Sequence, residues 1–360
     1  MATSFAFILN RVSVPVRRCL RPAVLVFFLL VPTLALAGDE PEISQAVTSS
    51  YLYHLGTFTG TIPFEWVPII IDEARQEVYV LNSGEHSVYI FNDSGLQVYQ
   101  FDINDRLGNV GGLALLENGD ILLLCYPPSG SEATLFRCDY RGDVQEEIAF
   151  TGLPPALGRF RPDRMVLRKG RLYLAQMGDL RVAVFDLQGK YLEHFDLAKL
   201  LGLRREDGPV NADLGGFDVD QDGTMFFTVP SMFHGYRLRP GHELEEFGRS
   251  GGAPGRFNVV GGIAAGPEGL IFTADTLKSA ILVFDQNFNF LFEFGYRGSH
   301  PDSMVGPRNI AVSQSGKLYV TQLAKQGIKV FRFTVAPLTP PEPVEHVKPV
   351  APVEPAEGGK

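Results

Sequence analysis

Histidine is the first residue type in this chain that could support metal chemistry. His86, His194 and His300 are almost evenly spaced along the sequence. A zinc site needs three or four such ligands that converge on one ion. The local patterns around these histidines differ, because the first precedes a β-rich run, the second lies inside one, and the third lies in a linker-like stretch. We therefore predict no metal site from these three side chains.

Two short motifs resemble known functional loops but lack the context that those loops need. Residues 248–252 match the Gly-x-Ser-x-Gly pattern of hydrolases, which requires a strand, a tight turn and a helix, whereas here the motif lies in a glycine-rich segment. Residues 218–223 begin like a calcium loop, but the twelfth position is Val229 instead of glutamate. We predict an acidic hairpin turn there, and we predict no catalytic residue, metal ion or cofactor.

The N-terminal residues 1–37 have the order of a secretory signal peptide. Four arginines precede an apolar run, no acidic residue is present, and Ala35, Leu36 and Ala37 form a small-residue cleavage site. We expect export to a periplasm or the cell exterior. The alternative is an uncleaved anchor, which would be the chain's only membrane contact. Cleavage changes the formal net charge from −9 to −13, so nucleic acid is not expected as a partner.

Composition also sets the limits of the folded part. Residues 38–50 are expected to form a linker, and residues 334–360, rich in Pro and Glu, a disordered tail that cannot bury a core. Cys125 and Cys138 are the only cysteines that remain after cleavage, and the sequence leaves open whether they pair.

One sequence pattern repeats along the middle of the chain, and this repeat predicts the fold class. Six apolar runs open six units, and most are followed by a polar turn containing glycine and by further β-rich runs. The period is close to 47 residues, as in the interval from Phe284 to Phe331. The openings lie at residues 67–71, 111–114, 163–166, 215–218, 261–264 and 308–311.

Short, evenly spaced strands without room for crossover helices predict an all-β fold. Four strands in each unit predict a six-bladed β-propeller over residues 51–333, with four-stranded antiparallel blades. The sixth unit has only three strands of its own, while residues 51–56 resemble a fourth strand. We therefore expect the N-terminal strand to close the ring and cover an open edge.

Two glycine-rich linkers carry a family resemblance. Residues 247–257, which lead into Gly262, Ile263 and Ala264, and residues 294–312 are similar to the linkers between blades of NHL-repeat proteins. Residues 82–88 resemble the Asn-His element of that family, with Glu85 in place of the Asn. Blades two to four depart most from the pattern. The resemblance implies a propeller within a group that includes binding proteins as well as lyases, lactonases and strictosidine-synthase-like hydrolases. The signal peptide and the tail favour an exported protein of bacterial type.

Candidate binding residues follow from their positions in the repeat. Propeller ligands usually meet the face that carries the loops into each first strand and out of each second strand. Two loops, at residues 126–130 and 230–234, would place aromatic groups there, and six basic residues between 159 and 171 could steer an anionic partner. The candidates are Trp66, Asn82, Tyr126, Arg164, Gln176, Phe233, His234, Asp275, Arg308, Asn309 and Gln322.

These observations favour a scaffold that binds a protein partner or a ligand in the cell envelope. Fold alone does not determine function, and two alternatives remain open. A propeller enzyme would need a bound ion or a convergent polar cluster in the channel. A structural spacer would depend on the Pro-rich tail.

Overall fold

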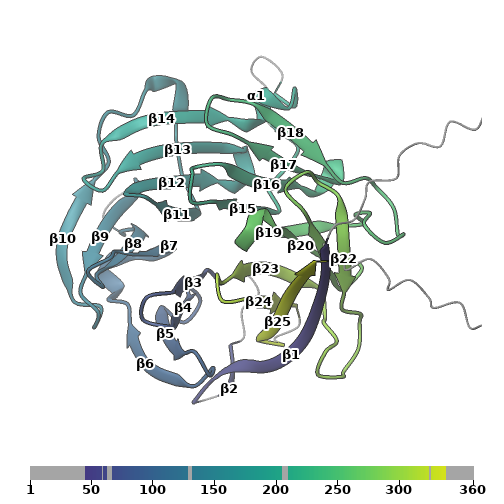
Figure 1. The fold of residues 1–360 in the computed structure, drawn as a ribbon. Helices are drawn as coiled ribbons and strands as arrows, with labels where there is room; N and C mark the ends of the chain where they lie inside the picture. The colour runs from purple at the N-terminus through teal and green to yellow at the C-terminus, as the bar shows by residue number, and fades with distance from the viewer. Residues whose placement is uncertain are drawn as a thin grey trace, which may run out of the picture. The chain divides into compact units, whose positions relative to one another are not determined.

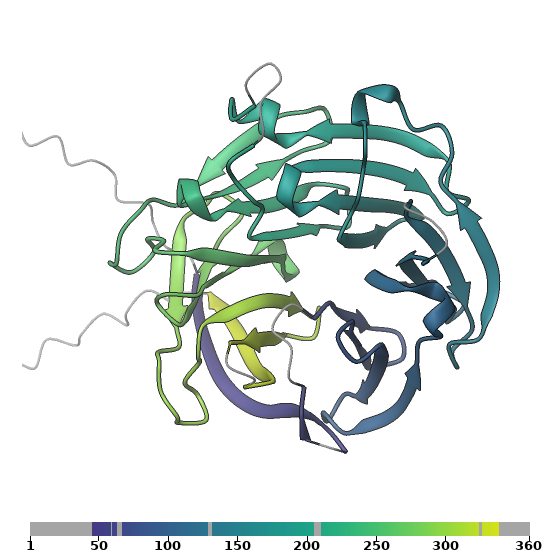
Figure 2. The same cartoon turned by 180° about the vertical axis from the view of Figure 1, so that it is seen from behind.

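The computed structural model describes residues 45–58, 60–62, 67–128, 132–204, 210–323 and 326–337. The predicted signal peptide, Trp66 and most of the predicted tail lie outside these residues. Within residues 45–337, six antiparallel sheets are arranged as blades around a common centre (Figures 1 and 2). The prediction of an all-β, six-bladed propeller is confirmed.

The first five blades each contain four strands that pair in chain order. All six predicted openings are first strands, which lie nearest the centre (Figure 1). The strands are β3 (Ile69–Asp72), β4 (Glu77–Asn82), β5 (Ser87–Asn92) and β6 (Gln97–Asp102) in blade 1; β7 (Asn109–Leu115), β8 (Ile121–Tyr126), β9 (Thr134–Cys138) and β10 (Val144–Ala149) in blade 2; β11 (Arg164–Arg168), β12 (Arg171–Gln176), β13 (Arg181–Asp186) and β14 (Tyr191–Asp196) in blade 3; β15 (Gly216–Val219), β16 (Met225–Val229), β17 (His234–Leu238) and β18 (Leu244–Phe247) in blade 4; and β19 (Val260–Ala265), β20 (Ile271–Asp275), β21 (Ala280–Phe284) and β22 (Phe290–Phe294) in blade 5.

The sixth blade combines both ends of the described chain. Its strands β23 (Pro307–Val312), β24 (Lys317–Gln322) and β25 (Ile328–Pro337) are followed by β1 (Gln45–Thr57), which pairs antiparallel with β25, and by the short β2 (Gly60–Thr61). The pairing extends beyond the expected limits of 51 and 333 because Val47 is buried in the core and the hydroxyls of Thr48 and Thr334 hydrogen-bond at 2.7 Å. Whether β1 is what holds the ring closed stays a prediction.

Glycines let the first strands approach one another near the centre. A Cβ atom on Gly262 would lie 2.3 Å from the carbonyl oxygen of Arg308, and one on Gly216 would lie 2.6 Å from the amide of Ile263. No side chain fits at such distances. The Gly-Gly pairs of the sequence therefore mark positions where neighbouring first strands pack backbone to backbone.

The core lies between the faces of adjoining blades. Alternate residues of one strand face opposite neighbours: Val166 packs in a cluster with blade 4, whereas Met165 and Leu167 pack with blade 2. Cys125 and Cys138 are both buried in the cluster between blades 1 and 2, and they are free thiols.

The connection to each third strand is built alike in five blades. The residue immediately before that strand has a positive φ: His86, Leu180, Phe233, Ser279 and Gly327. Only one of these is glycine, so side chains are held in a conformation that L-residues rarely adopt. The same backbone conformation therefore leads into the third strand in these five blades.

The two glycine-rich linkers fold as copies of each other. Gly248 and Gly295 both have a positive φ, and the segments that follow close with parallel bridges, Ser250 with Phe257 and Arg297 with Met304. Ser250 lies in this linker and not on a strand-turn-helix element.

Helices are minor elements of the described chain. The helix after β14 is short, because the chain turns at Gly202, whose φ is 67°. The helical segments are α1 (Leu197–Leu200) and the 3-10 turns η1 (Asp105–Leu107), η2 (Pro155–Leu157), η3 (Met177–Asp179), η4 (Pro230–Met232) and η5 (Pro267–Gly269). No helix in the described ranges is long and apolar enough to cross a membrane.

Candidate binding surface and central channel

Four candidate residues occupy the same place in their blades, as the repeat predicts. Asn82, Gln176, Asp275 and Gln322 are each the last residue of a second strand. Their polar groups bond to the chain itself: Asn82 accepts from the amide of Glu85, Gln176 from that of Arg161, and Gln322 from that of Val305. These side chains therefore hold the surrounding loops in place.

Asp275 is the most heavily used of the four. Its buried carboxylate accepts hydrogen bonds from the amides of Asn258 at 2.6 Å, Val259 at 3.2 Å, Leu277 at 3.1 Å and Lys278 at 2.9 Å. The first two amides precede β19 and the last two follow β20. One side chain thus ties together both loops of blade 5 at this face.

The loops of blades 4 and 5 at this face carry exposed apolar side chains. Phe233 and Val259 are each 37% exposed and Leu277 is 67% exposed. We name these three residues the blade 4–5 apolar surface. All three lie on loops into a first strand or out of a second strand, which is the face predicted from sequence. Phe233 was among the predicted residues; Val259 and Leu277 were missed.

Comparison with blade 3 shows that Phe233 is unusual. Leu180 occupies the equivalent position, with the same positive φ, and is fully buried. His234, which follows Phe233, has a buried Nδ1 atom without a hydrogen-bond partner among the described residues. The large apolar side chain of blade 4 is thus turned outward where that of blade 3 is covered.

Tyr126 and Arg308 belong to the packing between blades. The hydroxyl of Tyr126 donates to the carbonyl of Pro162 at 2.5 Å, and the guanidinium of Arg161 lies 4.9 Å from its ring. The backbone of Arg308 lies against Gly262 of the neighbouring blade. The loop predicted to follow Tyr126 is described only as far as Pro128.

Arg164 and Asn309 meet across the centre of the propeller. They belong to β11 and β23, the first strands of blades 3 and 6, which are opposite each other in the ring. Nη2 of Arg164 donates to Oδ1 of Asn309 at 3.1 Å, and the amide nitrogen of Asn309 donates to the carbonyl of Val67 at 2.9 Å. The pair bridges the central channel at the end where first strands begin.

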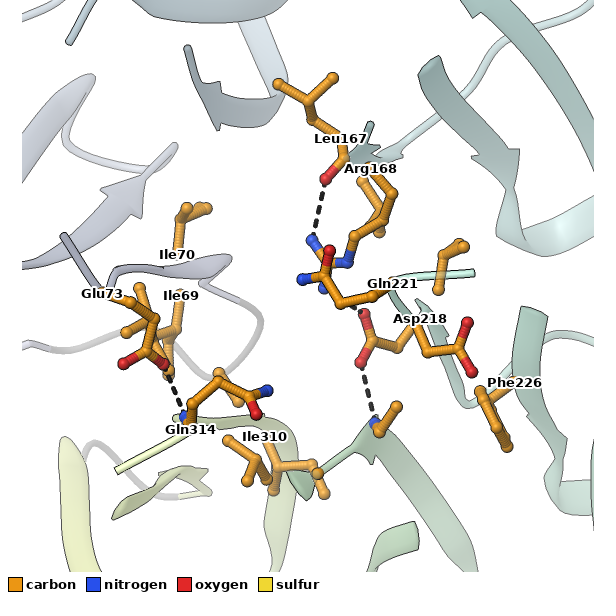
Figure 3. Close-up of a pocket in the computed structure, with 18 of the residues that line it drawn as sticks. Ile69, Ile70, Glu73, Leu167, Arg168, Asp218, Gln221, Phe226, Ile310 and Gln314 are labelled. Carbon is orange, nitrogen blue, oxygen red and sulfur yellow. Dashed lines mark hydrogen bonds and ion pairs between the residues drawn. The ribbon is translucent and has the colours of Figure 1, made fainter. Parts of the chain in front are cut away.

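A cavity of about 530 Å³ occupies the channel beside this bridge. Its walls come from the first strands of all six blades, and its mouth lies among the turns between first and second strands. Figure 3 shows Arg168 of β11 reaching toward Asp218 of β15, at 3.2 Å, with Gln221 beside them. Asp218 also accepts from the amide of Ala265 at 3.0 Å. The cavity therefore opens on the face opposite to the one predicted for ligands.

The predicted basic cluster is divided by the fold, which corrects the expectation of one positively charged field. Arg159 and Arg161 precede β11, whereas Arg168, Lys169 and Arg171 lie at its far end. The two ends of an extended five-residue strand lie about 13 Å apart.

The three histidines weighed as zinc ligands lie in separate surroundings. His86 is 3.7 Å from Asp105, His194 bonds to the hydroxyl of Tyr191, and His300 bonds to Asp302. Within the described ranges, no group of three or more His, Cys, Asp or Glu side chains is arranged to hold a metal ion.

Asp220 has the largest carboxyl pKa shift at the channel mouth. Burial, and next the carboxyl group of Asp222, raise the pKa of Asp220 to about 7 from 3.8, while Asp220 holds the pKa of Asp222 below its ordinary value. A raised pKa in the folded state means that ionisation destabilises the fold. This cost is absent below pH 3.8 and is complete only above pH 7.

Asp220→Asn is expected to stabilise the protein in a pH-dependent way. Asparagine keeps the Oδ1 acceptor for the amides of Asp222 and Thr224. After discounting for partial exposure, we expect about 1 kcal/mol more unfolding free energy at pH 8 and a smaller gain at pH 5. Urea unfolding at both pH values measures this. Asp139→Asn, in an exposed turn with the same type of amide contacts, is the control. Equal gains at both pH values would contradict the assignment.

Comparison with known proteins places the chain by its fold. No protein-family model matches it. Over 78 residues it is 33% identical to the protein brain tumor of Drosophila melanogaster, a match that covers 21% of this chain and 8% of that protein's length. The chain thus spans a small part of that curated relative.

Solved structures resemble the chain over most of its length. A luciferin-regenerating enzyme has a TM-score of 0.54 at 12% identity, over 80% of this chain and 95% of its own. Regucalcin from Agrobacterium tumefaciens, described as a calcium-binding protein, has a TM-score of 0.52 at 15% identity, over 76% and 92%. At such low identity the likeness shows the fold alone. The chain is a six-bladed β-propeller protein.

Proposed function

We propose that this chain is an exported propeller of the NHL-repeat type that binds a protein partner in the cell envelope through the blade 4–5 apolar surface. The observation that carries the proposal is Leu277, a large apolar side chain that is 67% exposed on a rigid turn. Exposed apolar groups on a fixed framework are typical of protein interfaces.

The turn that carries Leu277 is held from both sides. Asp275 bonds to the amides of Leu277 and Lys278. The Lys278 ammonium group bonds to Glu293 at 2.5 Å and to the carbonyls of Ala253 and Arg256 at 3.1 and 3.2 Å. A partner would therefore meet a preorganised turn, and little backbone conformational entropy would be lost on binding.

The double variant Phe233→Ser/Leu277→Ser tests the proposal. Burial of these two side chains at an interface is worth about 3 to 5 kcal/mol, so we expect partner binding to weaken at least tenfold. The measurement is affinity capture from the envelope fraction with the wild-type chain, followed by titration of the recovered partner.

The matched control is Leu96→Ser. Leu96 is 66% exposed, as Leu277 is, but lies in a turn of blade 1. Unchanged binding by the double variant, or equal loss in the control, would contradict the proposal. The chain recovered from the envelope fraction also tests export. If the signal peptide is cleaved after Ala37, the recovered chain begins at Gly38.

A further inference from the structure

The central channel has features of a ligand site that the proposed partner surface does not use. Arg164 lines the cavity beside its bridged end, and within the described ranges the only hydrogen bond of its guanidinium group is to the neutral side chain of Asn309. A guanidinium group has five N–H donors. Most donors of Arg164 therefore have no acceptor in the described protein.

The charge of Arg164 is also poorly balanced. The carboxylate of Asp218 is shared between Arg168 and the amide of Ala265. Burial lowers the pKa of Arg164, and so does the nearby charge of Arg168; the carboxylates of Asp218 and Asp163 offset this only in part. Buried charges in proteins are normally paired, so this end of the cavity can accept a negative charge.

Half-buried apolar side chains contribute part of the channel wall, together with polar groups. Ile70, Leu115, Leu167, Ala265 and Val312, each from a different first strand, line the cavity. The Nε atom of Arg168, near the mouth, is buried without a partner in the described chain. Apolar walls with a few fixed polar groups are the usual composition of a small-molecule site.

We propose that the channel binds an organic anion whose carboxylate or phosphate group meets Arg164 and whose apolar body lies along the channel toward the mouth. Arg164 and Arg168 are four residues apart on one strand, about 13 Å. The anionic group is thereby kept away from Asp220 and Asp222, which lie in the turn at the mouth. The mouth of the cavity opens at the opposite face from the blade 4–5 apolar surface, so a ligand would enter without using that surface.

Isothermal titration of the mature chain with octanoate, octyl phosphate and neutral octanamide tests this site. We expect one anionic probe to bind with a stoichiometry of one, at least tenfold more tightly than octanamide. The better of octanoate and octyl phosphate identifies the head group. Arg164→Gln is expected to lower affinity for that probe at least tenfold and to leave octanamide binding unchanged.

Two further variants keep the test interpretable. Arg164→Lys retains the charge, so its loss of affinity should be smaller than that of Arg164→Gln even if both lower the melting temperature. Arg239→Gln removes a guanidinium whose side chain is 41% exposed in blade 4 and should have no effect. Equal binding of octanamide, no loss in Arg164→Gln, or no binding of either anion at millimolar concentration would overturn the proposal.

Discussion

Removal of residues 38–57, which include strand β1, is expected to lower the melting temperature of the propeller by about 10 °C or more. Leu55 and Val47 are buried in clusters with blade 6 residues, and β1 pairs with β25 from Gln45 to Leu55. Burial of these two side chains alone is worth about 3 to 6 kcal/mol. For a chain of this size, each kcal/mol lowers the melting temperature by roughly 2 °C. Loss of the β1–β25 pairing adds to the loss of buried side chains, so we expect a large decrease in melting temperature.

The control for this truncation removes residues 38–44 and leaves β1 intact. Circular dichroism during heating compares the two chains. An equal melting temperature for both would contradict the prediction that β1 closes the ring, and closure would then depend on contacts among blades 1 and 6. The truncated chain is also expected to self-associate, because β25 would become an exposed edge.

Asp275→Ala is expected to cost about 3 to 5 kcal/mol of unfolding free energy. Four backbone amides lose their acceptor at a site that is fully buried, and water cannot readily replace it. The variant should also weaken partner binding, because the same carboxylate positions Val259 and Leu277. Chemical denaturation measures the first effect and partner titration the second.

Two comparisons make this second prediction specific. Asp275→Asn keeps one acceptor oxygen and should lose less stability than the alanine variant. Asp285→Ala, in a turn of the same blade where the carboxylate accepts from the amides of Asn287 and Asn289, should cost about 1 kcal/mol. A similar cost for Asp275→Ala and Asp285→Ala would show that Asp275 is an ordinary turn residue.

The fold was predictable because its signals are local and repeated. Each Gly-Gly or apolar opening became a first strand, and the equivalence of Asn82 and Asp275 followed from their place in the repeat. Strand alternation and turn glycines depend on neighbours in sequence. Six consistent copies therefore determined the blade count.

The site was less predictable because it depends on contacts between blades. The sequence placed Arg164 and Asn309 near the channel, but their bond joins residues 145 positions apart. Leu277 was missed because exposure of an apolar residue depends on what the neighbouring loops leave uncovered. The basic residues looked contiguous, yet β11 sends them to different faces.

Photo-crosslinking from position 277 in living cells tests whether the blade 4–5 apolar surface contacts a protein partner. A photoreactive residue replaces Leu277 in one chain and Leu96 in another, since both are equally exposed. We expect one specific crosslinked protein from position 277 and none from position 96. Crosslinks of equal yield and pattern from both positions, or none from position 277, would contradict partner binding through the blade 4–5 apolar surface.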